Sequence, residues 1–395
     1  MNNPTWEGLL LRSERIRQNR GQKEICIGLC VPSYLCKIEK GQAVATKELL
    51  TELFKRLGIC YETDELFIKN MHLMIKEYFR KYLYGLDTSQ IVHSLVTEEV
   101  RLLYSSLRID YLLIKGLAGD NTVIPLLKEI AFGFSKEQEA FYYLLVGMYT
   151  EEREKKLSFY GKASEIMHYS YFMLMQGYAY LENSNYTGIH SLEGHLIPTA
   201  LEEGNIYTMA EYYLLKGTAY GSLDMDEMML IYYKRAIRMC ENTGWAHIKD
   251  NAYYNIGAVY LCQNRFAEAK EYLNKVENET FLLLHKKALL AIRSGDFLNG
   301  KEYLKQMKCH LLDEEEGKLK HLIYQEAVME LEEDFVLNPE YELLLDKLIV
   351  ELKKHMHFGF LYSFKDVIIS TYIAHRKYKK ALEFQNEISA NVMNR

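Results

Sequence analysis

A small residue recurs through most of this chain at intervals of 30 to 40 residues, each time inside a stretch with helical patterning. The positions are Gly116, Gly147, Gly177, Gly217, Gly257 and Ala288, and a further stretch of the same kind is centred on Ile369. Self-similarity at such a period is typical of helical hairpins stacked in series, because each hairpin buries its apolar face only against its neighbours. The pattern therefore predicts an all-α chain dominated by a helical solenoid.

The clearest unit begins near Asp250 and reads DNAYYNIGAVYLCQNRFAEAKEYLNKVEN. Its repeated positions are Tyr253, Gly257, Tyr260, Ala269 and Leu273. They resemble the tetratricopeptide pattern, in which a glycine lets the two helices of a unit approach closely and a second-helix alanine admits the neighbouring unit. The resemblance implies a right-handed tetratricopeptide-like solenoid over residues 85–395, in which 317–352 supply a degenerate unit.

A different pattern lies near the amino end, in the stretch QKEICIGLCVPSYLCKIEKG from Gln22 to Gly41. Its apolar side chains can share the inner face, and its polar side chains the outer face, of two short helices joined by a tight turn. Pro32 suits the first turn of a helix and Gly41 suits the position just after one, so residues 32–39 are predicted to be helical. A helix-turn-helix of this size places its second helix in the major groove of DNA. Further helices are expected over 6–20, 47–57 and 67–84.

Charge supports a separate role for the amino end. Residues 1–60 hold ten Lys and Arg against six Asp and Glu, a net charge of +4, and the rest of the chain carries −10. A basic head on an acidic body is typical of a small polyanion-binding module on a carrier that does not itself bind polyanions. Contact with double-stranded DNA is therefore expected from the head alone.

The helix-turn-helix stretch also carries a family resemblance. The matching positions are Gln22, Ile25, Leu29, Cys30 and the run SYLCKIEKG from Ser33 to Gly41. They resemble the Xre/Cro-type motif of peptide-sensing regulators of Gram-positive bacteria, a group that includes Rgg and PlcR and is often called the RRNPP family. Cys36 stands where that family usually has serine. The matching stretch covers roughly a twentieth of the chain.

The resemblance implies a cytosolic transcription regulator that binds its operator as a homodimer and senses a short signalling peptide. Residues 1–65 would form the DNA-binding domain, 66–84 a linker helix, and 85–395 the repeat domain for peptide binding and dimerisation. Two alternatives stay open: a regulator whose repeats bind a protein partner, and a phage-type repressor without a small ligand.

Six polar residues of the head are candidate DNA contacts: Arg15, Gln22, Lys23, Ser33, Tyr34 and Lys37. We expect Arg15 and Gln22 to contact phosphates, which fix the register of the protein on the duplex. Ser33, Tyr34 and Lys37 are expected to contact base edges or the adjoining backbone.

Four residues of the repeats are candidate peptide contacts: Asn251, Tyr254, Asn255 and Glu211. An asparagine amide can donate to a peptide carbonyl and accept from a peptide N–H at the same time. The family resemblance implies the same use of asparagine. The alternative is that Asn251 caps its helix and Asn255 bonds a neighbouring loop.

The sequence offers little for catalysis or for metal binding. It contains no P-loop, no G-x-S-x-G and no H-E-x-x-H, so an enzyme is not predicted. Cys26, Cys30 and Cys36 have the spacing C-x3-C-x5-C without a paired C-x2-C or a nearby histidine, so no metal and no cofactor are expected. No apolar run reaches 18 residues and the first residues lack a secretory signal, so we expect a cytoplasmic protein without a membrane span.

Overall fold

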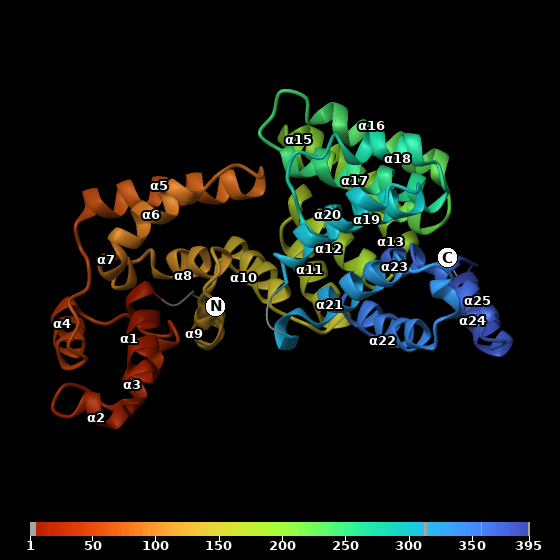
Figure 1. The fold of residues 1–395 in the computed structure, drawn as a ribbon. Helices are drawn as coiled ribbons and strands as arrows, with labels where there is room; N and C mark the ends of the chain where they lie inside the picture. Colours follow the sequence, from red (N-terminus) through yellow and green to blue (C-terminus); the bar gives the residue numbers. More distant parts are fainter. Residues whose placement is uncertain (1–4, 312–313, 357, 394–395) are drawn as a thin grey trace. The chain divides into compact units, whose positions relative to one another are not determined.

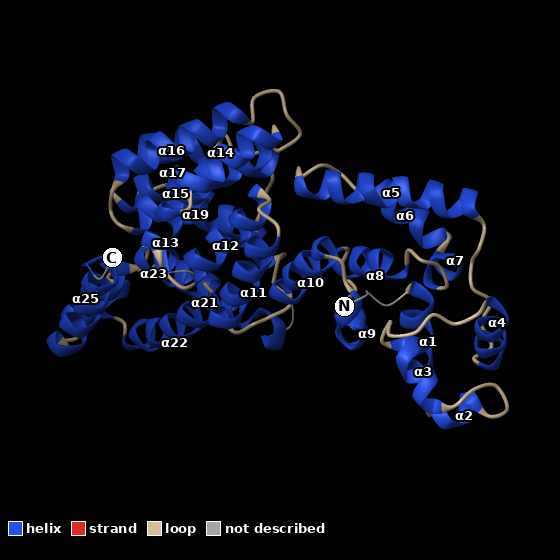
Figure 2. Ribbon diagram, turned by 180° about the vertical axis from the view of Figure 1, so that it is seen from behind, coloured by secondary structure: helices blue, strands red, loops and turns tan. Residues whose placement is uncertain are grey.

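The computed structural model describes residues 5–311, 314–356 and 358–393, and every regular element in that part of the chain is a helix (Figures 1 and 2). The predicted all-α class is confirmed. The chain divides into two compact units, residues 1–176 and 177–395.

Unit 1 begins with α1 (Trp6–Arg17), α2 (Gln22–Cys26), α3 (Pro32–Glu39), α4 (Lys47–Arg56), α5 (Glu65–Leu83), α6 (Ser89–Thr97), α7 (Glu99–Leu103) and α8 (Arg108–Leu117). It continues with the short helix η1 (Asn121–Val123), α9 (Ile124–Ile130), η2 (Ala131–Gly133), α10 (Lys136–Met148), α11 (Arg153–Ile166) and the first half of α12 (Ser170–Glu182).

Unit 2 contains α13 (Tyr186–Ser191), α14 (Glu193–Glu203), α15 (Ile206–Ser222), α16 (Asp226–Met239), α17 (Ala246–Cys262), α18 (Phe266–Leu273), α19 (Phe281–Arg293) and α20 (Phe297–Lys308). It ends with α21 (Glu314–Met329), η3 (Phe335–Leu337), α22 (Pro339–His355), α23 (Phe358–Tyr362), α24 (Lys365–Ala374) and α25 (Tyr378–Met393).

Helices α1 to α4 form the predicted helix-turn-helix around one apolar core. The buried members of this core are Leu10, Leu11, Ile25, Cys26, Leu35, Ile38, Leu53, Phe54, Leu57 and Ile59, and Trp6 packs against them beside Tyr61. The second helix of the motif spans Pro32–Glu39, as the proline and glycine positions predict. The first helix ends at Arg17 rather than at residue 20, because Asn19 turns the chain with a φ of 52°.

The helix-turn-helix packs against the later helices of unit 1. Arg108 at the start of α8 donates to the Glu14 carboxylate of α1 at 2.8 Å, and both side chains are buried. Arg101 donates to Glu62 at 2.6 Å. These contacts join the segment before residue 65 to helices of the predicted repeat domain, and the functional boundaries at 65 and 84 stay predictions.

The repeats form helical hairpins, as predicted. In unit 2 the paired helices are α15 with α16, α17 with α18, α19 with α20, α21 with α22, and α24 with α25. A Cβ atom at Gly257 would lie 2.7 Å from Cγ of Leu273 on the partner helix, so the close approach requires glycine there. The α21–α22 hairpin supplies the unit expected within 317–352.

The hairpins of unit 2 pack around apolar cores, which include one around Leu289 and another around Ala252. Trp245 packs on one of these cores with its ring 5.4 Å from that of Tyr207. The short helix α23 contacts both α15 and α22.

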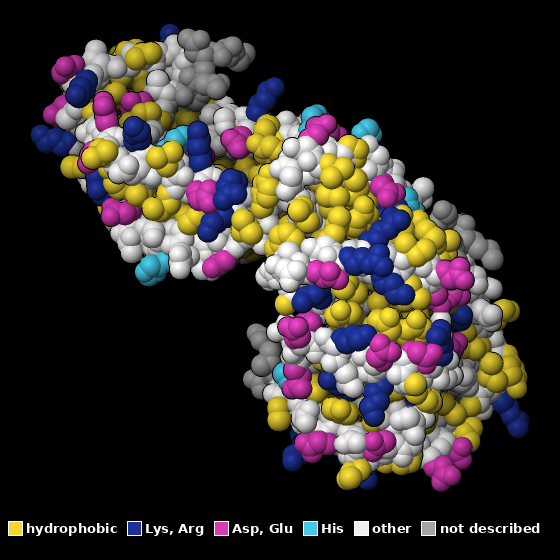
Figure 3. All heavy atoms as spheres, turned by 90° about the horizontal axis from the view of Figure 1, so that it is seen from above, with side chains coloured by type: hydrophobic (Ala, Val, Ile, Leu, Met, Phe, Trp, Pro, Cys, Tyr) yellow, Lys and Arg dark blue, Asp and Glu magenta, His cyan; other side chains and the backbone are white. Residues whose placement is uncertain are grey.

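Lys and Arg side chains are interspersed with Asp and Glu on the face drawn in Figure 3. Within the described residues, no helix has both the length and the apolar character needed to cross a membrane.

Candidate functional site

The helix-turn-helix exposes one polar face of α3. Pro32 occupies the first turn, where an N–H would lack an intrahelical acceptor. Leu35 and Ile38 are buried in the core and so turn the opposite face outward. Ser33 and Lys37, one helical turn apart, are both exposed on α3. Exposed polar side chains at this spacing on the second helix can reach base edges in a major groove.

Two other predicted DNA contacts flank this face. Lys23 is exposed on α2. The Tyr34 hydroxyl donates to the carbonyl oxygen of Val44 at 3.1 Å, which ties α3 to the loop that follows it. The DNA-contacting roles of Lys23, Ser33, Tyr34 and Lys37 stay predictions.

Glu39, at the end of α3, engages the two predicted phosphate contacts. Its carboxylate accepts from Nε and Nη2 of Arg15 at 2.8 and 2.9 Å, and from Nε2 of Gln22 at 2.7 Å. The Glu39 side chain is 1% exposed and that of Arg15 is 14% exposed. The hydrogen bond to Glu39 raises the pKa of the Arg15 guanidinium. Arg15 and Gln22 thus fasten α1 and α2 to α3, and their contacts with phosphates stay predictions.

Sequence reasoning missed this role of Glu39. The available signal was its position four residues after Leu35, on the core side of an amphipathic helix. A carboxylate at such a position needs a cationic or amide partner once it is buried.

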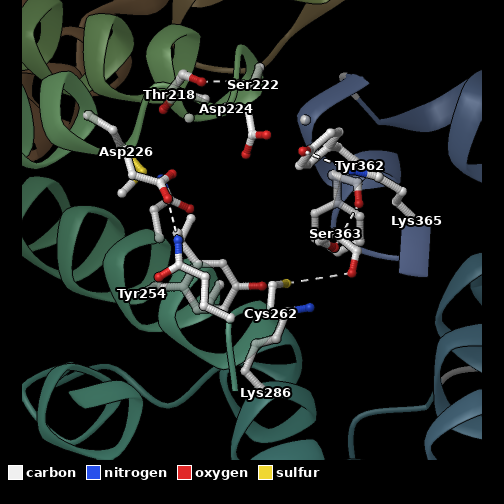
Figure 4. Close-up of a pocket in the computed structure, with 18 of the residues that line it drawn as sticks. Thr218, Ser222, Asp224, Asp226, Tyr254, Cys262, Lys286, Tyr362, Ser363 and Lys365 are labelled. Atoms are coloured by element: carbon white, nitrogen blue, oxygen red, sulfur yellow. Dashed lines mark hydrogen bonds between the residues drawn. The ribbon is translucent and has the colours of Figure 1, made fainter. Parts of the chain in front are cut away.

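In unit 2, α17 contributes to two cavities. The larger one, here called the Asn251 cavity, has a volume of about 640 Å³. The smaller one, here called the Lys286 cavity, has a volume of about 280 Å³ and is drawn in Figure 4. The Tyr254 side chain lines both. Concave sites are the usual form of a ligand site, and the Asn251 cavity has the typical lining of few polar groups among apolar ones.

The Asn251 cavity has an apolar wall and a polar edge. Its apolar lining comes from Val276, Phe281, Leu282, Leu283, Leu319, Ile323 and Met356. Asp250 fixes the loop after α18 by accepting from the backbone N–H groups of Glu277 and Asn278 at 2.9 and 3.1 Å. Asn251 is exposed at the cavity and available to a ligand.

The structure brings three of the four predicted peptide contacts together on α17. Asn251 lines the larger cavity, Asn255 the smaller one, and Tyr254 both. Glu211 lines neither cavity. Its carboxylate accepts from the Tyr178 hydroxyl and lies 2.9 Å from Nε2 of His247, which does line the Asn251 cavity. The hydrogen bond to Glu211 raises the pKa of His247. The peptide contacts stay predictions.

The Lys286 cavity contains charged groups that the sequence did not reveal. It is lined by residues of α15, α16, α17 and α19, by Asp224 between α15 and α16, and by the segment from Gly359 to Asp366. Figure 4 shows Asp224 and Asp226 at one end of the cavity and Lys286 at the other. Burial, followed by the neighbouring Asp224 carboxylate, raises the pKa of Asp226. Within the described part of the chain, no group of three His, Cys, Asp or Glu side chains is placed to hold a metal ion.

Comparison with solved structures identifies the fold. The apo form of the quorum sensor NprR from B. thuringiensis superposes with a TM-score of 0.58 at 15% identity, over 82% of this chain and 99% of that one. A Rap protein complexed with Competence and Sporulation Factor also gives a TM-score of 0.58, at 12% identity, over 82% of this chain and 97% of that one.

The chain has the fold of NprR and Rap. The predicted architecture, a helix-turn-helix followed by helical repeats, is therefore confirmed, as is the resemblance in fold to the RRNPP regulators. A structure of Bacillus thuringiensis PlcR in complex with the peptide PapR7 and DNA matches over 72% of this chain at 15% identity, but its TM-score of 0.34 is too low to support an argument. No protein-family profile and no curated protein sequence matches the chain.

Proposed function

We propose that this chain is a cytoplasmic transcription regulator, not an enzyme, that binds double-stranded DNA through α3. A short signalling peptide would bind at the α17 cavities and control operator binding. The observation that carries the proposal is the presence, in one chain, of an exposed helix-turn-helix and of ligand-sized cavities within a fold shared with the quorum sensor NprR.

Charge and exposure support DNA binding by residues 1–65. The first 60 residues are basic while the remainder of the chain is acidic. Ser33 and Lys37 are exposed on α3, and Lys23 is exposed on α2. The duplex would therefore meet a localised positive surface, which favours phosphate contacts.

Cavity shape and chemistry support peptide binding by residues 85–395. The Asn251 cavity offers an apolar wall for side chains and an exposed amide for the peptide backbone. The Rap structure with the same fold holds Competence and Sporulation Factor, which supports a ligand role for this fold.

Dimerisation is part of the proposal because two half-sites on DNA require two helix-turn-helix domains, one from each copy of the chain. Leu343 and Val350 are 59% and 62% exposed, two turns apart on α22, and offer an apolar face for a second copy. Light scattering of the purified chain should give twice the mass of 46.4 kDa. A monomer at micromolar concentration would contradict this part of the proposal.

DNA binding is tested by selecting duplexes from a random pool and measuring their affinity by fluorescence anisotropy. Lys37→Ala should weaken binding about tenfold and reduce the slope of log affinity against log salt by about one. Lys55→Ala is the matched control, because Lys55 is 75% exposed but lies on α4. Failure to recover any duplex, or equal losses in both variants, would contradict the proposed interface.

Peptide binding is tested by affinity selection from random hexapeptides, followed by calorimetry with the peptides retained. Asn251→Ala should weaken binding about five- to tenfold, because the backbone of the peptide loses an amide partner. Asn299→Ala on α20 serves as a control outside both cavities. Retention of no peptide, together with capture of a defined protein partner, would favour the regulator controlled by a protein.

A further inference from the structure

A buried lysine, Lys286, lines the Lys286 cavity and forms no ion pair with any described residue. Lys286 lies on α19 and is 3% exposed. Among the described residues, none accepts a hydrogen bond from its ammonium. The ammonium lies over the rings of Phe364 and Phe360, whose centroids lie 5.3 and 5.7 Å from Nζ. Such ring contacts are weaker than an ion pair, so the desolvation of the ammonium is only partly offset.

The two buried carboxylates whose charge acts on Lys286, Glu326 and Glu330, are already engaged with other groups. Glu326 lies 3.1 Å from Nε2 of His285 and accepts from the Tyr341 hydroxyl at 3.4 Å. Glu330 accepts from Nη2 and Nε of Arg293 at 2.6 and 2.9 Å. Neither carboxylate forms an ion pair with Lys286, and burial lowers the pKa of this lysine.

A second donor in the same cavity also lacks a partner. The Tyr254 hydroxyl is buried and, within the described part of the chain, makes no hydrogen bond. Tyr254 and Lys286 both line the Lys286 cavity. A lysine ammonium can only donate, and a tyrosine hydroxyl can donate too, so an acceptor with two oxygens would satisfy both groups.

The opposite end of the cavity restricts the charge of the ligand. Asp224 and Asp226 line it there, as Figure 4 shows, and Asp366 is a third acidic member. Lys286 and Lys365 are the lysines of the lining, and Lys365 donates to the Tyr362 hydroxyl at 3.4 Å. Because two ammonium groups face three carboxylates, a dianionic phosphate would leave a large excess of negative charge in the cavity. A single carboxylate is matched by a single ammonium, and a cationic group elsewhere on the same ligand would be matched by the aspartates.

We infer that the Lys286 cavity binds a carboxylate of the peptide ligand, held by the Lys286 ammonium and the Tyr254 hydroxyl, with a cationic group of the same peptide at Asp224 and Asp226. This inference rests on the proposed peptide-binding function and names the chemistry of its ligand. The carboxylate is either the carboxy terminus of the peptide or an acidic side chain.

The test uses the full chain and two pools of random hexapeptides that are identical except for a free or an amidated carboxy terminus. Retained peptides are sequenced, resynthesised with each carboxylate replaced in turn by an amide, and measured by calorimetry. For the wild type, one such replacement should raise Kd at least about tenfold. In Lys286→Met the same replacement should have no effect, while Lys287→Met on the same helix should behave as the wild type.

The outcomes separate this inference from the function on which it rests. Peptides that bind the wild type and Lys286→Met with the same preference for carboxylates overturn the inference and leave peptide binding intact. Retention of no peptide from either pool overturns both the inference and the peptide-binding function.

The melting temperature of the ligand-free protein is an independent readout. Lys286→Met should raise it, because an unpaired buried charge is removed. A lower melting temperature with unchanged peptide preference would assign Lys286 to the scaffold.

Discussion

Glu39 joins three helices of the helix-turn-helix through one carboxylate. The contacts from Arg15 and Gln22 place α1 and α2 against the helix that would enter the groove. A buried pair of this kind stabilises little relative to apolar packing, but breaking it leaves an uncompensated charge. The position of α3 therefore depends on Glu39 more than on any one exposed residue of the motif.

Replacing Glu39 by glutamine should loosen this motif. We expect Glu39→Gln to lower the free energy of unfolding of the helix-turn-helix by about 2–3 kcal/mol, because Arg15 loses its counter-charge. Hydrogen exchange of the α3 amide protons measures the change. Glu24→Gln is the control, because Glu24 forms an exposed pair with Arg20 and should cost less than about 0.5 kcal/mol. Equal effects of the two variants would contradict the role assigned to Glu39.

The pair of Glu211 and His247 should titrate in an observable way. The hydrogen bond to Glu211 raises the pKa of His247 above its ordinary value of 6.5, and Asp250 adds to this shift. Because the folded-state pKa is the higher one, the contact contributes fully below pH 6.5 and is lost as pH rises through the raised value. An NMR titration of the imidazole should show the raised pKa, and Glu211→Gln should return it toward 6.5. An unshifted titration in the wild type would contradict the contact.

The helical hairpins depend on contacts at single small residues. Gly147 on α10 faces α11, where an added Cβ would overlap the Tyr160 ring. Tyr160 is buried, so its ring cannot move aside without disturbing the packing. The α10–α11 hairpin is therefore closed by steric fit rather than by the helix propensity of its residues.

Two glycines in the α10–α11 hairpin, Gly147 and Gly161, allow a matched comparison. Gly147→Ala should destabilise unit 1 by about 1–3 kcal/mol, because the methyl group overpacks the helix interface. Gly161→Ala on α11 should stabilise it by up to about 1 kcal/mol, because the new Cβ meets only Nε2 of Gln176, at 3.7 Å, and alanine favours the helix. Urea unfolding followed by circular dichroism measures both. A stabilising Gly147→Ala would show that the hairpin tolerates a wider separation.

The helices could be predicted from the sequence wherever particular residue types, such as proline and glycine, stand at their ends or contacts. Pro32 and Gly41 delimit the recognition helix, and the spacing of glycines gives the hairpins, because both signals depend on nearby backbone geometry. The end of α1 was missed because Asn19 adopts a left-handed conformation that asparagine tolerates without requiring it. Lys286 was missed for a different reason. Its environment is made by α17, α19 and the segment after α22, which only tertiary packing brings together.

For the molecule as a whole, the proposed function requires that two binding events be linked. If a peptide changes operator affinity by some factor, then operator DNA must change peptide affinity by the same factor. Calorimetry of a retained peptide with and without saturating operator duplex should therefore give the ratio of Kd values found by anisotropy with and without peptide. Typical couplings of 1–3 kcal/mol correspond to about 5- to 150-fold. Two equal Kd values would mean that the chain binds both ligands without regulation.

The chain contains two tryptophans, and each lies in a different unit. Trp6 packs on the core of the helix-turn-helix, and Trp245 lies beside Tyr207 on a core of unit 2. Each unit therefore carries its own intrinsic fluorophore. Trp6→Phe would leave an emission spectrum that reports on the repeats alone, and Trp245→Phe one that reports on the head alone. Adding peptide to the first variant and DNA to the second would allow each event to be followed in solution without a chemical label.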